Sequence, residues 1–152
     1  MSRLVWTIGH SNREWEAFLA VLQHYGVQRL VDVRSHPRSR FLHFKREALA
    51  HLLPEAGVEY VWMGDTLGGL RPGGYGAWMR SEAFGRGLAE LERLAAERPT
   101  AFMCAERDPR QCHRRYIALA LLDRGWEVRH LISLDESYPA GQEALQLSFD
   151  MS

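Results

Sequence analysis

Short apolar runs alternate with segments of helical periodicity over most of this 152-residue chain. Each apolar run is rich in β-branched or aromatic residues, which is typical of a buried strand. The expected strands are 4–8, 29–33, 58–62, 100–104 and 127–132. The segments between them place apolar residues on one face of a helix. The expected helices lie between the cap Ser11 or Asn12 and Gly26, over 45–53, from the cap Ser81 to before Pro99, and from the cap Asp108 to Gly125.

Strands that are apolar throughout and alternate with helices predict a parallel sheet covered on both faces. We therefore expect an α/β fold of three layers, α/β/α, with a mostly parallel central sheet of about five strands. The length favours a single domain, 1–152, with its core at about 4–132. The remaining segment, 133–152, has weak periodicity and is expected to be a tail or an appended edge element.

Ligands of such sheets bind beyond the carboxyl ends of the strands. Four loops follow expected strands there: 9–12, 34–44, the glycine-rich 64–76 and the stretch after Cys104. The glycine-rich loop is expected to have no regular element and is either a lid over a substrate or a plain connecting loop. The candidate ligand-binding residues are His10, Ser11, Asn12, Asp32, Arg34, Arg38, Gly68, Gly69 and Arg114.

The charge distribution is uneven although the formal net charge is zero. The segment 33–46 has five basic residues and no acidic one. Arginine binds planar oxyanions with two parallel hydrogen bonds, so we expect a site for an anionic, phosphate-bearing small molecule or nucleotide. A nucleic-acid-binding module that uses 34–46 is the alternative, although a pI near 7.1 disfavours it. A solvated basic surface is the plainer interpretation of the same charges.

Both cysteines lie in one stretch, "CAERDPRQCHRRY", at 104–116. Asp108 as cap and Pro109 as first helical residue would put Cys112 and His113 in or near the first turn of a helix. The positive helix end favours a thiolate at Cys112. In an enzyme, Cys112 or Cys104, which ends the expected strand, is the candidate nucleophile or redox centre. Glu106 and His113 are the candidate proton-transfer groups. Simple packing is the alternative for both cysteines.

Two further alternatives involve the same residues. A zinc site could use Cys104, Cys112, His113 and His10, but the close paired spacing of zinc ligands is missing, so our preferred site has no metal. Cys104 and Arg110 have the C-x5-R spacing of cysteine-dependent phosphatases. The sequence identifies no cofactor and no oligomeric state, and it leaves enzyme and binding protein as alternatives.

The sequence favours a location in the cytoplasm. No apolar run approaches the roughly 20 residues that a membrane-spanning helix needs, so no membrane partner is expected. The N-terminal apolar run is short for a signal peptide. Two cysteines without an export signal are typical of a reducing compartment, where thiols serve chemistry, metals or packing.

Four ordered motifs carry a family resemblance: "TIGHS" at 7–11, "VDVRSHPRSR" at 31–40, "LGG" at 67–69 and "CAERDPRQCHR" at 104–114. Together they resemble the family called domain of unknown function 488, from about Thr7 to His130. The resemblance implies a compact α/β domain and no particular activity. The "VDVR" motif and the strand-ending cysteine are also similar to rhodanese and cysteine-phosphatase folds. That second resemblance implies that Cys104 carries sulfur or phosphate.

Overall fold

A six-stranded sheet forms the centre of the protein, which we describe from a computed structural model over residues 3–141. The strand order is β3-β2-β4-β1-β5-β6. The strands are β1 (Leu4–Gly9), β2 (Arg29–Asp32), β3 (Glu59–Trp62), β4 (Thr100–Cys104), β5 (Glu127–Leu131) and β6 (Ser137–Pro139). All neighbours are parallel except β5 and β6. The five expected strands are therefore confirmed, and the sixth is an edge strand from the segment after 132; the rest of that expected tail, 142–152, lies outside the described residues.

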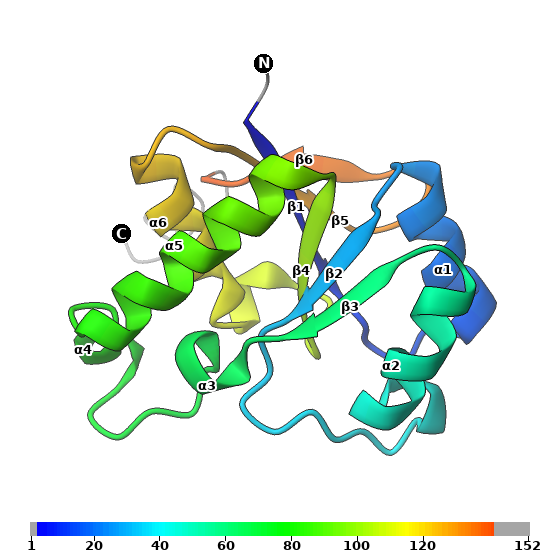
Figure 1. Ribbon diagram of the computed structural model, residues 1–152, viewed down its shortest axis with the longest axis horizontal. Coiled ribbons are helices and arrows are strands. Elements are labelled where there is room, and N and C mark those ends of the chain that lie inside the picture. Colours follow the sequence, from blue (N-terminus) through cyan, green and yellow to red (C-terminus); the bar gives the residue numbers. More distant parts are fainter. Residues whose placement is uncertain (1–2, 142–152) are drawn as a thin grey trace, which may run out of the picture.

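Helices cover both faces of the sheet, as the alternation of strands and helices predicted. Helices α1 (Trp15–His24) and α2 (Arg46–Glu55) lie on one face, and α5 (Glu82–Glu97) and α6 (Arg114–Asp123) lie on the other (Figure 1). Neighbouring strand residues point to opposite faces: Leu30 packs with α1 and α2, whereas Val31 packs with α5 and α6. The fold is thus a three-layer α/β/α sandwich with two apolar cores.

One expected helix start is confirmed and another is wrong. The Ser81 hydroxyl accepts a hydrogen bond from the Phe84 backbone N–H and caps α5. In contrast, α1 begins at Trp15 without a side-chain cap, so neither Ser11 nor Asn12 caps it. The reason is that the backbone N–H groups of His10 and Ser11 donate to the carbonyls of Cys104 and Ala105. These bonds continue the pairing of β1 with β4 past the end of the strands and delay the helix.

The loops at the carboxyl ends of the strands also differ from expectation. The glycine-rich segment contains two short helices, α3 (Gly64–Leu67) and α4 (Tyr75–Trp78), and η1 (Leu42–Phe44) lies before α2. Asp108 caps only the 3-10 turn η2 (Pro109–Gln111). Cys112 then has extended backbone, with φ −136° and ψ 145°, so the helix α6 starts only at Arg114. The expected continuous helix from Asp108 is therefore interrupted at the second cysteine.

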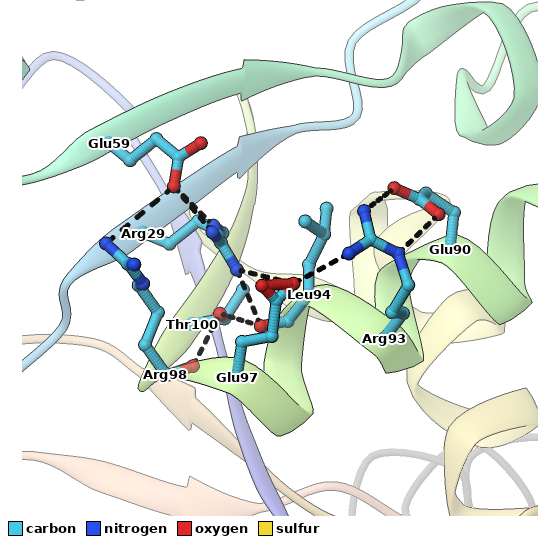
Figure 2. Close-up of polar contacts among 8 residues, drawn as sticks. All are labelled: Arg29, Glu59, Glu90, Arg93, Leu94, Glu97, Arg98 and Thr100. Carbon is cyan, nitrogen blue, oxygen red and sulfur yellow. Dashed lines mark hydrogen bonds and ion pairs between the residues drawn. The ribbon is translucent and has the colours of Figure 1, made fainter.

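An ion-pair network lies at the amino ends of the strands, on the side of the sheet opposite to the loops described above (Figure 2). Arg29 is 4% exposed and donates to Glu59 Oε2 at 2.7 Å and to the Leu94 carbonyl at 2.8 Å. The Thr100 hydroxyl donates to the Arg98 carbonyl. These bonds satisfy carbonyls near the end of α5 that have no partner within the helix. The network therefore holds the end of α5 against the sheet.

Within 3–141, none of the helices has both the length and the apolar character that crossing a membrane would require.

Candidate functional site

A buried carboxylate fixes the first candidate arginine. Asp32 ends β2 and is fully buried; its Oδ1 accepts from Arg34 Nε at 2.8 Å and its Oδ2 from Arg34 Nη2 at 2.7 Å. The Tyr60 hydroxyl, from the neighbouring strand β3, donates to Oδ2 at 2.6 Å. Burial and the adjacent carboxylate raise the pKa of Tyr60 well above its ordinary value, so this hydroxyl keeps its proton. Asp32 therefore holds one edge of the Arg34 guanidinium and leaves Nη1 directed elsewhere.

His10 lies on the other side of that guanidinium. Its Nδ1 is 2.8 Å from the Ser11 carbonyl, which can only accept, so Nδ1 carries the proton. Its Nε2 is 3.4 Å from Arg34 Nη1 and is then the acceptor. The ring stacks on Phe44, with centroids 4.4 Å apart. Burial lowers the pKa of His10 to about 4, although the bond to the Ser11 carbonyl opposes this shift. His10 is therefore a neutral group that orients Arg34 at pH 7.

Glycines allow the loops of this edge to meet. A Cβ at Gly9 would lie 1.7 Å from the Glu106 carbonyl oxygen, and one at Gly68 would lie 2.3 Å from Ser35 Oγ. A Cβ at Gly69 would lie 2.6 Å from His113 Nδ1. No side chain larger than hydrogen fits at these distances. The "GH" and "LGG" motifs thus bring the loops after β1, β2, β3 and β4 into contact.

The two cysteines are joined by a disulfide, which the sequence did not predict. Both are largely buried: Cys112 is 8% exposed and Cys104 is 2% exposed. His113 Nδ1 lies 3.6 Å from Cys112 Sγ, while His113 Nε2 lies 2.8 Å from the Val33 carbonyl. Because that carbonyl only accepts, Nε2 carries the proton and Nδ1 presents a lone pair to the sulfur. Burial lowers the pKa of His113, so the ring is neutral at pH 7.

Two adjoining cavities open where these loops meet, and we call them together the cleft. The first, of about 340 Å³, is lined by Arg34, Ser35, His36, Arg38, Gly69, Leu70, Cys104, Ala105, Glu106, Gln111, Cys112 and His113. The second, of about 590 Å³, shares four of these residues and adds His10, Ser11, Asn12, Ser39, Arg40, Phe41, Arg107 and Asp108. Arg38 and Glu106 border both cavities, and both side chains are exposed.

The structure therefore brings together most of the candidates that the sequence singled out, from four separate loops. Asp32, Gly68 and Arg114 do not line the cleft. Asp32 is hydrogen-bonded to the Arg34 guanidinium, and Gly68 packs against Ser35. Arg114 is fully buried and its Nη2 donates to the carbonyls of Glu106 and Arg107. These three residues shape the walls of the cleft.

Two contributors were missed from the sequence. Tyr60 completes the shell around Asp32, and Tyr75 stacks on His113 with centroids 5.4 Å apart. The hydroxyl of Tyr60, next to apolar Val61 and Trp62 in the strand, was the available signal. For Tyr75, in a glycine-rich segment with no clear periodicity, the sequence contained no comparable signal.

Ser11 has φ of +52°, and it is the one non-glycine residue with positive φ among residues 3–141. Such a conformation costs a serine of order 1–2 kcal/mol. It persists here because Ser11 N–H is bonded to Ala105 and its carbonyl accepts from His10. Strain of this kind is common where a protein pre-organises a binding site.

The zinc alternative has no geometric support in the described part of the chain. No group of three or more His, Cys, Asp or Glu side chains lies close enough together there to hold a metal ion. Two of the four proposed ligands are joined to each other in the disulfide.

The protein is an α/β protein with a mostly parallel sheet and a cleft, lined by polar side chains, at the carboxyl ends of its strands. The sequence pattern of the family described as "Domain of unknown function DUF488" matches residues 14–75 and 71–121, and the chain belongs to this family. Comparisons with curated proteins and with solved structures produced no match. The similarity to rhodaneses and cysteine phosphatases therefore has no support beyond the two motifs that suggested it.

Proposed function

We propose that the cleft binds an anionic small molecule that carries a phosphate group. The observation that carries this proposal is the state of Arg38: its side chain borders both cavities, and its guanidinium has no hydrogen bond or ion pair with residues 3–141. Most arginines elsewhere in the described chain are paired with a carboxylate or a backbone carbonyl. An unpaired guanidinium at a concave site is available to pair with an anion, and a concave surface that holds several cations attracts an anion more strongly than one isolated cation does.

Arg34 would supply the second, rigid contact. Asp32 and His10 hold its guanidinium on two sides, so little side-chain entropy remains to be lost when a ligand binds. Its Nη1 edge lies beside the Arg38 carbonyl, at 3.5 Å, in the wall of the first cavity. Arg40, which lies over the Phe41 ring, adds positive charge at the second cavity. The arrangement combines one fixed and two movable cations.

Glu106 is the group that would make the site an enzyme. Its exposed side chain borders both cavities, as Arg38 does, so its carboxyl could exchange a proton with a ligand bound there. His113 is less suited to contact with the ligand, since its Nε2 is bonded to Val33 and its Nδ1 faces Cys112. A phosphatase-like role for Cys104 is disfavoured because Arg110, the arginine of the C-x5-R spacing, is engaged with both oxygens of Asp108.

Isothermal titration calorimetry with inorganic phosphate, pyrophosphate and a nucleoside monophosphate tests the proposal. We expect saturable binding of at least one of them. Arg38→Gln should weaken that binding about tenfold or more, because a charge-assisted hydrogen bond contributes about 1.5–3 kcal/mol. The matched control is Arg86→Gln, an exposed arginine on α5 far from the cleft, which should leave binding unchanged.

Two results would reject the proposal. One is the absence of saturable binding for all three anions. The other is an equal effect of both arginine substitutions, which would indicate nonspecific charge attraction. Binding of duplex DNA that falls steeply with salt and is insensitive to Arg34→Lys would instead support the nucleic-acid-binding alternative.

A further inference from the structure

The disulfide lies in the wall of the cleft, and this position differs from that of a purely structural crosslink. Cys104 ends β4, and Cys112 precedes α6; both line the first cavity beside Arg38. The two cysteines are eight positions apart in the sequence and close a small loop. A crosslink of this loop length stabilises the fold by about 2–3 kcal/mol through the unfolded chain, which is less than a crosslink that closes a long loop. The disulfide also lies beside ionisable groups, because Arg38, Glu106 and His113 line the same cavity.

The surroundings of Cys112 suit a sulfur that is released as a thiolate. His113 Nδ1 presents a lone pair 3.6 Å from Sγ and would accept the thiol proton. The backbone N–H of Arg114, at the start of the ten-residue helix α6, donates to the same sulfur at 3.5 Å. A helix start stabilises negative charge. Cys104 has no histidine contact of this kind within the described residues, and it is less exposed than Cys112.

We propose that Cys104 and Cys112 form a redox-active pair that exchanges electrons with a small thiol carrying a negative charge, and that the thiol attacks at Cys112. The preference for a negative charge rests on the proposed anion site, because Arg38 and Arg34 border the same cavity as the disulfide. Attack at Cys112 follows from its larger exposure, 8% against 2% for Cys104.

The reaction has two balanced steps. The thiolate of the small molecule attacks Cys112 Sγ, a mixed disulfide forms, and the bond to Cys104 breaks; Cys104 leaves as a thiolate and takes a proton from water. A second small thiolate attacks the small-molecule sulfur of the mixed disulfide. Its product is the small-molecule disulfide, and Cys112 leaves as a thiolate that is stabilised by the Arg114 N–H and takes a proton from water. Two small thiols are oxidised, and the protein disulfide gains two electrons and two protons.

The test compares three small thiols of one size: anionic 2-mercaptoethanesulfonate, neutral 2-mercaptoethanol and cationic 2-mercaptoethylamine. The protein is first oxidised with the disulfide of 2-mercaptoethanesulfonate, and reduction is followed by alkylation and mass spectrometry at equal thiolate concentrations. We expect the anionic thiol to react about fivefold faster than the neutral one, since an interaction of about 1 kcal/mol at the cleft suffices for this ratio. The cationic thiol should be the slowest, and Arg38→Gln but not Arg86→Gln should reduce the differences.

The sulfur that is attacked is identified from the trapped mixed disulfide, which we expect on Cys112. In single-cysteine variants, Cys104→Ser should react with the small-molecule disulfide at least tenfold faster than Cys112→Ser. Three results would overturn the inference: an oxidised protein that no thiol reduces, a mixed disulfide on Cys104, or equal rates for the three thiols. Phosphate binding by the Cys104→Ser/Cys112→Ser double variant decides the proposed function separately, because neither sulfur is needed for it.

Discussion

Replacement of Asp32 by asparagine should be one of the most damaging conservative changes in this chain. The carboxylate is fully buried and accepts two hydrogen bonds from the Arg34 side chain, one from the Arg34 backbone N–H at 3.1 Å and one from the Tyr60 hydroxyl. Asparagine removes the charge and replaces one acceptor oxygen by a donor. Arg34, which is 5% exposed, then remains as a buried cation without its counter-ion. Breaking a buried ion pair in this way costs about 3–5 kcal/mol.

The loss can be measured as a shift in urea or thermal unfolding, followed by the fluorescence of the five tryptophans. For a chain of this length, 1 kcal/mol corresponds to about 2–4 °C, so Asp32→Asn should lower Tm by about 6–20 °C. Tyr60→Phe removes one neutral donor to the same carboxylate and should cost only about 1–2 kcal/mol. The comparison separates loss of the charge from loss of a single hydrogen bond.

A double variant tests whether the unpaired charge of Arg34 causes the loss of stability in Asp32→Asn. Asp32→Leu with Arg34→Met removes both charges and fills similar volume, and such replacements of buried ion pairs are often neutral or stabilising. We expect the double variant to be more stable than Asp32→Asn despite its second substitution. An Asp32→Asn protein within about 1 kcal/mol of the wild type, or a double variant less stable than the single one, would show that the pair does not control stability at this edge of the sheet.

Two further predictions concern pH and glycine packing. Burial lowers the pKa of His10 from 6.5 to about 4, so the neutral ring stabilises the fold above pH 6.5, and this contribution is lost as the pH falls toward 4. By pH 5 the free energy of unfolding should fall by about 2 kcal/mol. The urea midpoint of His10→Gln should fall less over the same pH range than that of the wild type. A pH-independent midpoint would contradict this. On α5, Gly85→Ala enters open space and should stabilise the protein by about 0.5–1 kcal/mol, whereas Gly87→Ala would place Cβ 2.4 Å from Thr66 Oγ1 and should destabilise it by about 1–3 kcal/mol. Equal changes in Tm for the two alanine variants would show that α3, which contains Thr66, can move away from α5 at no energetic cost.

Local sequence patterns predicted which helices and strands form, but they did not always predict the residue at which each one begins. The run "TAFMC" is β4 with the expected bounds, and Ser81 caps α5 as its position before an amphipathic segment suggested. At His10 and Ser11 the same kind of cap signal was misleading, because bonds to a strand about 95 residues later in the chain compete for their backbone. At Cys112 a link to Cys104 accompanies an extended residue inside the expected helix.

For the candidate site, too, the sequence predicted the location correctly but not the detail. The rule that ligands bind at the carboxyl ends of parallel strands selected the four loops that meet in the cleft. It did not indicate which side chain of each loop faces the cavity. Both Arg34 and Arg38 were expected to bind the ligand, yet Arg34 is buried against Asp32 and Arg38 is exposed at the rim. Arg114 was expected to bind a ligand, and its guanidinium instead supports the loop from inside.

The sequence by itself determined the layers of this protein, because apolar periodicity is a local property and a continuous apolar strand must be covered on both faces. It also determined that arginine, cysteine and histidine side chains gather at one edge of the sheet. The tertiary structure alone decided which of these groups are paired, which are enclosed and which remain available. Pairing and burial depend on contacts between segments distant in the chain, such as Asp32 with Tyr60 and His113 with Gly69, and no local pattern encodes those distances.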